Sequence, residues 1–381
     1  MAIKIAFGTS ILNRGLADKG IDGIGYYCQE LWEQLKNDSD LEILPFSFGS
    51  SLLTSNQQNK PDFLPEYSSY LIKKFMSDFL GPNLTNATNY FDRADLIHAT
   101  DHLIPAFANK PIIATIQDTV PITHQQLTKS IFSPIKSYVW KKLIRNVAHI
   151  ITASKFSKIA IHQSTNYSLD KITVIPHGVN PLFFESPDPD QIAQTINRFS
   201  LPEQFFLHIG TIQPRKNLIR LIQAHANLPH GYAKQFPLVI AGKLGWDNGE
   251  IMRAINDGIL NKRCRWISYI SDLDKRCLLH KAIGLPLVSL HEGFGMAIVE
   301  AFASNLPVIT SNITAMPEIA DKSALLVDPL NTDAITNAML LLIEDQNLCT
   351  QLKISGLMRA KEFTWEKTAL KTSKVYQSML F

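Results

Sequence analysis

Cysteine is scarce in this sequence, and its few occurrences form no recognisable site. The 381 residues include only four cysteines, Cys28, Cys264, Cys277 and Cys349, which are scattered along the chain. None of them forms a pair with the spacing of a zinc site or a dithiol motif. The pattern argues against a metal-binding or redox scaffold, and it predicts a protein of the reducing cytosol.

Long apolar runs and a strong charge of either sign are also missing. No apolar stretch reaches the roughly 20 residues that cross a bilayer, and residues 1–7 lack the apolar length and cleavage site of a signal peptide. A net charge of +3 does not indicate a nucleic-acid partner, and we expect none. With 45% apolar and 19% charged residues, the composition is typical of a soluble globular protein, and the length predicts two domains.

Short apolar runs alternate with longer helical patterns along the whole chain. Strands are expected at residues 3–7, 96–99, 112–116, 149–153, 172–175, 205–209, 238–241, 265–269, 286–290, 308–310 and 325–327. Helices are expected at residues 26–35, 218–226, 274–282 and 334–343. This alternation predicts an α/β protein with two doubly wound parallel-sheet (Rossmann-like) domains facing across a cleft, with ligands at the carboxyl ends of strands. The Pro- and Asp-rich segment 180–202 shows no clear periodicity and should link the domains.

The most informative segment begins at Glu292 and ends at Glu300. A strand is expected just before it and a helix inside it, so Glu292 should lie near the carboxyl end of a strand. Gly293 and Gly295, with Phe294 between them, allow a tight turn and a close approach of the backbone to a ligand. The amides at the start of the helix would then face a crevice. Glu300 should lie one turn into this helix, and a complement to the helix dipole is the alternative explanation of its charge.

A second polar turn is expected at residues 208–217. A predicted strand ends there, Gly210 permits close approach of a ligand, and Arg215 and Lys216 arrive as a helix starts. Cations are unfavourable at a helix start if the dipole alone decides, so their presence favours a bound anion. An ammonium and a forked guanidinium can together neutralise a diphosphate. A solvated surface pair is the alternative interpretation.

In the N-terminal half, Gly23 and Gly25 precede the helix expected at 26–35. The pair lacks the third glycine of a dinucleotide fingerprint, and a loop expected at 9–22 separates it from the first strand. We therefore do not interpret this glycine pair as a nicotinamide site.

Together these segments resemble the retaining GT-B glycosyltransferases of family 4. Two glutamates separated by seven residues are a signature of that family, and Glu292 and Glu300 match it. The run Gly-Thr-Ile-Gln-Pro-Arg-Lys-Asn at 210–217 is similar to a second family motif. The resemblance covers nearly the whole chain and is strongest at residues 205–329. Within the family, the sequence is most similar to the mannosyltransferase-B-like bacterial enzymes of polysaccharide assembly.

The resemblance implies a role for each charged residue. Arg215 and Lys216 would hold the phosphates of the donor, together with the backbone amides of residues 293–295. Glu292 would accept hydrogen bonds from hydroxyls of the sugar, and Glu300 would accept them from the ribose.

Two positions in the N-terminal half depart from the family pattern. The segment of Gly23 and Gly25 resembles a loop that closes over the donor diphosphate, but Tyr26 stands where that pattern has an arginine. Gln117 and Asp118 follow a predicted strand where family members usually carry His-Asp beside the reacting sugar. The Gln117 amide cannot ionise, so it can position a hydroxyl but cannot act as an acid or a base.

The activity implied by the resemblance is that of a retaining hexosyltransferase that needs no metal and no cofactor besides its nucleotide-sugar donor. Our first expectation is transfer of mannose from GDP-mannose to a glycan or lipid-linked glycan. Residues 1–185 would form the acceptor-side domain and 186–364 the nucleotide-sugar-binding domain, with a helix at 365–381 packing back on the first. The alternatives are a nucleotide-sugar epimerase on the same fold and a non-catalytic sugar-nucleotide-binding subunit.

Two further features allow alternative interpretations. The Asp-x-Asp strings at 188–190 and 272–274 have the form of a metal-binding pair, but the first lies in the predicted linker and Asp272 is expected to be a helix N-cap. The basic amphipathic segment 125–147 contains no acidic residue. It fits either a core-packing helix with a solvated face or a peripheral contact with an anionic membrane. We therefore expect a cytoplasmic protein, with the inner face of the membrane as a candidate location.

Overall fold

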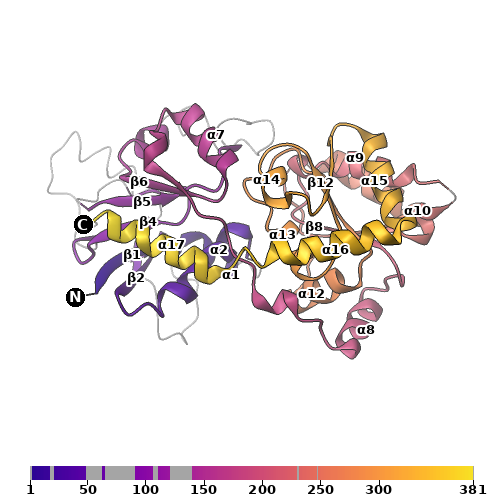
Figure 1. Cartoon of the computed structure of the whole chain (residues 1–381), viewed down its shortest axis with the longest axis horizontal. Helices are drawn as coiled ribbons and strands as arrows, with labels where there is room; N and C mark the ends of the chain where they lie inside the picture. The colour runs from indigo at the N-terminus through magenta and orange to yellow at the C-terminus, as the bar shows by residue number, and fades with distance from the viewer. Residues whose placement is uncertain are drawn as a thin grey trace. The chain divides into compact units, whose positions relative to one another are not determined.

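The computed structural model describes residues 2–17, 21–48, 62–64, 91–105, 110–120, 140–229, 231–246 and 248–380, with the backbone alone at 62–64. These residues form two compact units (Figure 1). The first unit takes in the described residues within 1–119, 132–178 and 365–381, and the second unit takes in those within 120–131 and 179–364.

The first unit is built on a seven-stranded parallel sheet with the order β3-β2-β1-β4-β5-β6-β7. Its strands are β1 (Ile3–Gly8), β2 (Leu41–Phe48), β3 (Asp62–Leu64), β4 (Leu96–Ala99), β5 (Ile112–Thr115), β6 (His149–Thr152) and β7 (Ile172–Val174). The order reverses at β1, where Ile5 is opposite Ile43 on one side and Leu96 on the other. Open α/β sheets bind ligands beyond the carboxyl ends of strands at such a reversal.

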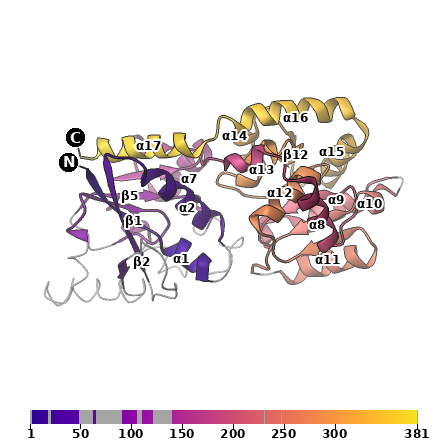
Figure 2. The ribbon, with the colours of Figure 1, turned by 90° about the horizontal axis from the view of Figure 1, so that it is seen from below.

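The helices of the first unit include one from the end of the chain. They are α1 (Ser10–Ala17), α2 (Gly23–Leu35), α7 (Lys155–Thr165), the 3₁₀ turn η3 (Leu169–Lys171) and α17 (Trp365–Ser378). In α17, Trp365, Ala369 and Tyr376 recur at helical spacing and join Ile5 and Leu31 in one buried core. Helix α17 runs beside α2 in the first unit (Figure 2). Burial of a large apolar side chain contributes roughly 1.5–3 kcal/mol, so this face holds α17 on the first unit.

The second unit is also built from parallel strands whose order reverses at one point. Two three-stranded parallel sheets have the orders β10-β9-β8 and β11-β12-β13. An isolated parallel bridge between Phe206 and Gly284 joins β8 to the residue just before β11, so β8 is the point of reversal. The strands are β8 (Phe206–Ile209), β9 (Leu238–Ala241), β10 (Cys264–Ile267), β11 (Leu285–Leu287), β12 (Val308–Ser311) and β13 (Leu325–Val327).

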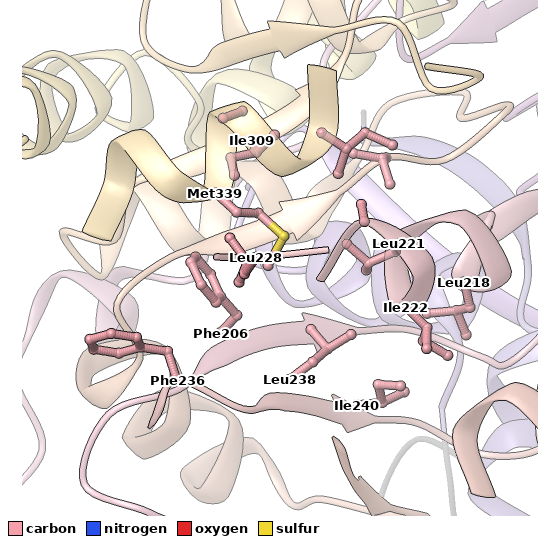
Figure 3. Packing of buried hydrophobic residues seen from close by; sticks show 14 of the residues in the cluster. Phe206, Leu218, Leu221, Ile222, Leu228, Phe236, Leu238, Ile240, Ile309 and Met339 are labelled. Atoms are coloured by element: carbon pink, nitrogen blue, oxygen red, sulfur yellow. The ribbon is translucent and has the colours of Figure 1, made fainter. Parts of the chain in front are cut away.

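Helices and 3₁₀ turns surround these strands. They are η4 (Pro181–Phe184), α8 (Pro189–Arg198), η5 (Pro214–Lys216), α9 (Leu218–Ala226), α10 (Tyr232–Gln235), α11 (Gly249–Leu260), α12 (Asp272–Lys281), α13 (Met296–Ala303), α14 (Met316–Ala320), α15 (Thr332–Glu344) and α16 (Gln346–Ala360). The core lies between the strands and helices α9 and α15, where Phe206, Leu221, Leu238, Ile309 and Met339 pack together (Figure 3). This packing fixes the loops that leave the carboxyl ends of β8 and β11.

Two segments that we expected to be irregular are helical. The predicted linker 180–202 contains η4 and α8, because Asp188 caps α8 through the Asp190 amide and Pro189 occupies its first turn. Ile192 and Ile196 are one turn apart in α8, but Thr195 is its one buried residue, so the apolar pattern in the sequence is short. The loop expected at 9–22 likewise contains α1. Strands β2 and β3 were not predicted, and Pro45 inside β2 argues against a strand by sequence alone.

Candidate functional site

In the second unit, a 3₁₀ turn rather than a helix carries the two predicted phosphate-binding cations. Arg215 and Lys216 lie in η5, and α9 begins only after Asn217, which adopts a left-handed conformation at φ 59°. The buried Asn217 amide donates to the carbonyls of Val288 and Pro329 at 3.0 and 2.7 Å. The turn is thereby fastened to the loop after β11.

Gly210 makes room for one of these cations. It directly follows β8, with φ +151°, and a β-carbon added there would lie 3.2 Å from Cε of Lys216. The close approach that the sequence predicted at Gly210 is thus made by a side chain of the same unit.

Glu292 lies between the two cations. Lys216 Nζ donates to Glu292 Oε1 at 2.6 Å, and Arg215 Nη1 donates to Oε2 at 2.7 Å. The Ser289 hydroxyl donates to Oε1 at 2.8 Å, and Arg215 also donates to the carbonyl of His291 at 3.1 Å. The side chain of Glu292 is only 9% exposed. The structure therefore brings together three residues that the sequence placed in two separate motifs.

The electrostatics of this cluster favour the ionised carboxylate. Burial by itself raises the pKa of Glu292, but the charges of Arg215 and Lys216 and the bonds from Lys216 and Ser289 lower it by more. The pKa of Glu292 ends far below its usual range. The three side chains therefore carry a net charge of +1 at any ordinary pH.

Helix α13 begins directly after the turn that follows Glu292. Gly295 is the N-cap, with φ +95°, a conformation that L side chains rarely adopt. Phe294 is buried and packs edge-on against Phe363, with ring centroids 5.7 Å apart. Phe294 therefore presents its backbone, and not its ring, to any ligand at the 293–295 turn.

Glu300 is held by a residue that the sequence did not point to. It is 3% exposed on α13, and Lys275 Nζ of α12 donates to its Oε1 at 2.5 Å. The Lys275 ammonium also lies 5.3 Å from the ring centroid of Phe183. No motif marks Lys275, because its partner is supplied by helix packing and not by local spacing.

In the first unit, Gln117 lies just beyond β5 and bonds to His177 just beyond β7. Its Oε1 lies 2.6 Å from His177 Nε2, and since a carbonyl oxygen can only accept, Nε2 carries the hydrogen. Among the described residues, the Gln117 Nε2 atom is buried without a hydrogen-bond partner. His177 is a buried partner of Gln117, 4% exposed, with its ring stacked on Trp365 at 6.0 Å and close to Tyr27 at 4.6 Å.

A buried chain of neutral polar groups lies behind this pair. The Tyr27 hydroxyl is 2.9 Å from Thr115 Oγ1, which is 2.7 Å from His98 Nε2, and His98 Nδ1 is 2.7 Å from the Tyr376 hydroxyl. Burial lowers the pKa of His98 and of His177 to about 3, so both rings are neutral near pH 7. The first unit thus holds this chain of polar groups without charge.

The glycine pair of the first unit is helical and not a loop. Gly23 and Gly25 form the first turn of α2, and the Gly25 amide donates to the carboxylate of its N-cap, Asp22, at 2.8 Å. A β-carbon at Gly25 would lie 2.7 Å from Ile21 Cγ2, so local packing explains this glycine. Asp118 follows Gln117, whose carbonyl accepts a bond from Ser157 Oγ at 3.1 Å.

The Asp-x-Asp strings have structural partners. Asp188 is the N-cap of α8. Ser271, and not Asp272 as we expected, caps α12 in a capping box with Asp274. Asp274 also pairs with Arg198. Within the described ranges, no three His, Cys, Asp or Glu residues are grouped so that they could hold a metal ion.

Most of the candidate membrane segment 125–147 lies outside the described residues, which resume at 140. Within 140–147, Trp140, Leu143, Ile144 and Val147 are buried. These apolar side chains pack against the protein. None of the helices in the described part of the chain is long and apolar enough to cross a membrane.

Two Rossmann-like units, one of which carries cations and carboxylates beside its point of strand reversal, define the class of α/β proteins with the GT-B fold. The family comparison agrees. Residues 21–182 match the model of Glycosyltransferase Family 4, and residues 196–357 match that of Glycosyl transferases group 1. The chain belongs to the family 4 glycosyltransferases.

Bacterial mannosyltransferases are among the relatives of this chain, in agreement with the predicted subgroup. The chain is 31% identical over 229 residues to the O-antigen chain mannosyltransferase B of Escherichia coli, a match that covers 60% of each chain. It is 27% identical over 223 residues to the serotype-specific mannosyltransferase WbdA of Escherichia coli, covering 58% of this chain and 27% of that one. The chain therefore spans less than two thirds of the length of either relative.

Among solved structures, the HepE protein of Anabaena in complex with UDP and glucose has the same fold. It superposes with a TM-score of 0.76 at 18% identity, covering 99% of this chain and 100% of that one.

Proposed function

We propose that this protein is a retaining hexosyltransferase that moves mannose from GDP-mannose to a glycan or lipid-linked glycan acceptor. The observation that carries the proposal is the cluster of Arg215, Lys216 and Glu292 beside the 293–295 turn. A largely buried group of charges with a net charge of +1, next to the N-terminus of a helix, suits a diphosphate leaving group.

In this proposal, the second unit binds the leaving group. Arg215 and Lys216 take up the negative charge that develops on the diphosphate as the bond to the sugar breaks, and no metal is required for that task. Glu300 accepts hydrogen bonds from the ribose, and Lys275 positions its carboxylate. The acceptor attacks on the face from which the phosphate departs, and the phosphate takes the proton of the acceptor hydroxyl.

The first unit contributes a neutral group to the sugar. Because His177 occupies the Gln117 oxygen, the Gln117 amide group is oriented to donate, and we assign it to an oxygen of the donor sugar. Gln117 positions the substrate in this scheme and transfers no proton.

The choice of mannose is supported by the relatives, which are named as mannosyltransferases. The choice of base needs a direct test, because the HepE structure contains UDP. A thermal-shift panel of GDP- and UDP-sugars tests it, since a ligand at a hundred times its dissociation constant stabilises the folded state by roughly 2.7 kcal/mol.

The same panel, followed by a transfer assay, separates the alternatives. Stabilisation by GDP-mannose and transfer of mannose to a lipid-linked glycan support the proposal. Preference for a UDP-sugar would contradict the donor while leaving the reaction class in place. Conversion of UDP-N-acetylglucosamine without an acceptor would indicate an epimerase, and donor binding without transfer would indicate a binding subunit. The proposed site of action is the cytoplasm, at the inner face of the membrane if the acceptor is lipid-linked.

A further inference from the structure

Glu292 is the residue whose surroundings differ most from the role that the family resemblance gives it. A glutamate that binds sugar hydroxyls needs carboxylate oxygens that can accept hydrogen bonds from the sugar. Here both carboxylate oxygens already accept bonds from the protein, Oε1 from Lys216 and Ser289 and Oε2 from Arg215. The strongest partners of Glu292 are therefore the two cations.

The carboxylate is also fixed in this position. Ser289, which is fully buried, holds Oε1 from the same loop, and Arg215 is tied to that loop by its bond to the His291 carbonyl. A carboxylate anchored in this way does not need to leave when an anion arrives. It stays beside the cations and offsets part of their charge.

The charge balance has a consequence for the product. Two cations without Glu292 would present +2 to a diphosphate in a setting where little solvent screens them, since the exposed fractions of the Arg215 and Lys216 side chains are 22% and 11%. An anion attracted that strongly is released slowly, because affinity differences between related complexes arise mainly from the rate of dissociation.

We propose that Glu292 tunes the affinity of the second unit for the diphosphate, keeping it low enough for the nucleoside diphosphate product to be released. This inference rests on the proposed function and deepens it. Glu292 then acts on the leaving group through Arg215 and Lys216, as a positioning and charge-balancing residue.

The test is the binding of inorganic pyrophosphate and of GDP and UDP to the full chain by calorimetry, with Glu292→Gln and Glu292→Ala compared with the wild type. Removal of one negative charge a few ångströms from a bound phosphate should tighten binding by about tenfold. The gain should appear with pyrophosphate as well as with a nucleoside diphosphate, and it should shrink as salt is added. Product inhibition by the nucleoside diphosphate should strengthen by a similar factor.

Glu344→Gln is the matched control, because it removes the same charge from an exposed position at the end of α15. It should leave pyrophosphate affinity unchanged. Circular dichroism and thermal melting show whether each variant is folded. If Glu292→Gln does not fold, the binding test is made with Glu292→Ala.

If the wild type binds a nucleoside diphosphate and neither Glu292 variant binds pyrophosphate more tightly, the charge-balancing role is wrong and the proposed function stands. If the wild type binds no nucleoside diphosphate at all, both proposals fail. Tighter binding in a folded Glu292 variant, but not in Glu344→Gln, supports the inference.

Discussion

The two units place polar groups at equivalent edges of their sheets by opposite electrostatic means. In the second unit, Glu292 and Glu300 are almost fully buried as charges and are compensated by ammonium and guanidinium groups. In the first unit, Gln117, His177 and His98 are held by hydrogen bonds between neutral groups. Burial of a charge without a partner is far more costly than burial of a hydrogen-bonded amide or imidazole. In the proposed function, the second unit binds the charged leaving group and the first unit binds hydroxyls.

The largest expected effect concerns the cations. Lys216→Ala should lower turnover about 10²- to 10³-fold, because one of the two cationic donors to the developing negative charge is lost. Steady-state kinetics with the donor identified in the panel measure this effect. Lys353→Ala on the exposed face of α16 is the control and should behave as wild type. Normal kinetics in Lys216→Ala would remove the cations from the reaction.

The second effect in order of size is a loss of stability when Lys275, the partner of Glu300, is replaced. Lys275→Met leaves a buried carboxylate unpaired, and the loss of one partner of a buried ion pair costs about 3–5 kcal/mol. The double variant Lys275→Met with Glu300→Met should recover most of that loss, as measured by urea unfolding. Lys281→Met at the end of the same helix is the control, with an expected change within about 0.5 kcal/mol. Equal loss in the single and double variants would show that the pair is not what stabilises this packing.

A third prediction concerns the neutral pair of the first unit. Gln117→Ala should lower turnover about tenfold through the loss of one neutral hydrogen bond to the sugar, with little change in the affinity for free nucleoside diphosphate. Gln117→His should retain more activity and should add an ionisation to the pH–rate profile near neutral pH. Wild-type turnover in Gln117→Ala would place the sugar elsewhere.

The pH dependence of stability should distinguish the two kinds of cluster. The folded-state pKa of His98 is about 3, below its unfolded value near 6.5, so its contribution is complete above pH 6.5 and is lost as the pH falls toward 3. Glu292 also has a lowered pKa, so its contribution is lost only below its ordinary value of 4.5. Between pH 7 and pH 4, the unfolding free energy measured with urea should therefore depend less steeply on pH in His98→Gln than in the wild type. The difference in slope should be up to about 1.4 kcal/mol per pH unit. Above pH 5, Glu292→Gln should keep the wild-type slope of the unfolding free energy against pH. A flattened slope above pH 5 would contradict the lowered pKa of Glu292.

The smallest expected effect is that of a chelator. Since Arg215 and Lys216 supply the positive charge in the proposed reaction, treatment with EDTA should leave turnover unchanged. Loss of activity with EDTA and its recovery with manganese would show that a cation shares this task.

The sequence was informative wherever a local rule applied. The predicted parallel α/β architecture is confirmed, and β4, β9, β13 and α9 have the predicted bounds. Asn305, a residue type that tolerates a left-handed helix cap, has φ 57° after α13. Prediction failed where the apolar pattern was weak, as in the polar helix α8. It also failed where a breaker residue lay inside an element, as with Pro45 in β2.

The sequence by itself determined the family, the alternation of strands and helices, and the identity of the turns that carry Gly210, Arg215, Lys216 and Glu292. These features depend on residues that are close together in the chain. Only the tertiary structure decided which side chains pair. Glu292 is 76 residues from Lys216, Gln117 is 60 residues from His177, and Lys275 reaches Glu300 from a different helix. The first two pairs form because parallel strands bring their carboxyl ends to one edge of a sheet, and the third forms because two helices pack together. The order of strands along that edge, like the packing of the helices, is set by the core and not by local sequence.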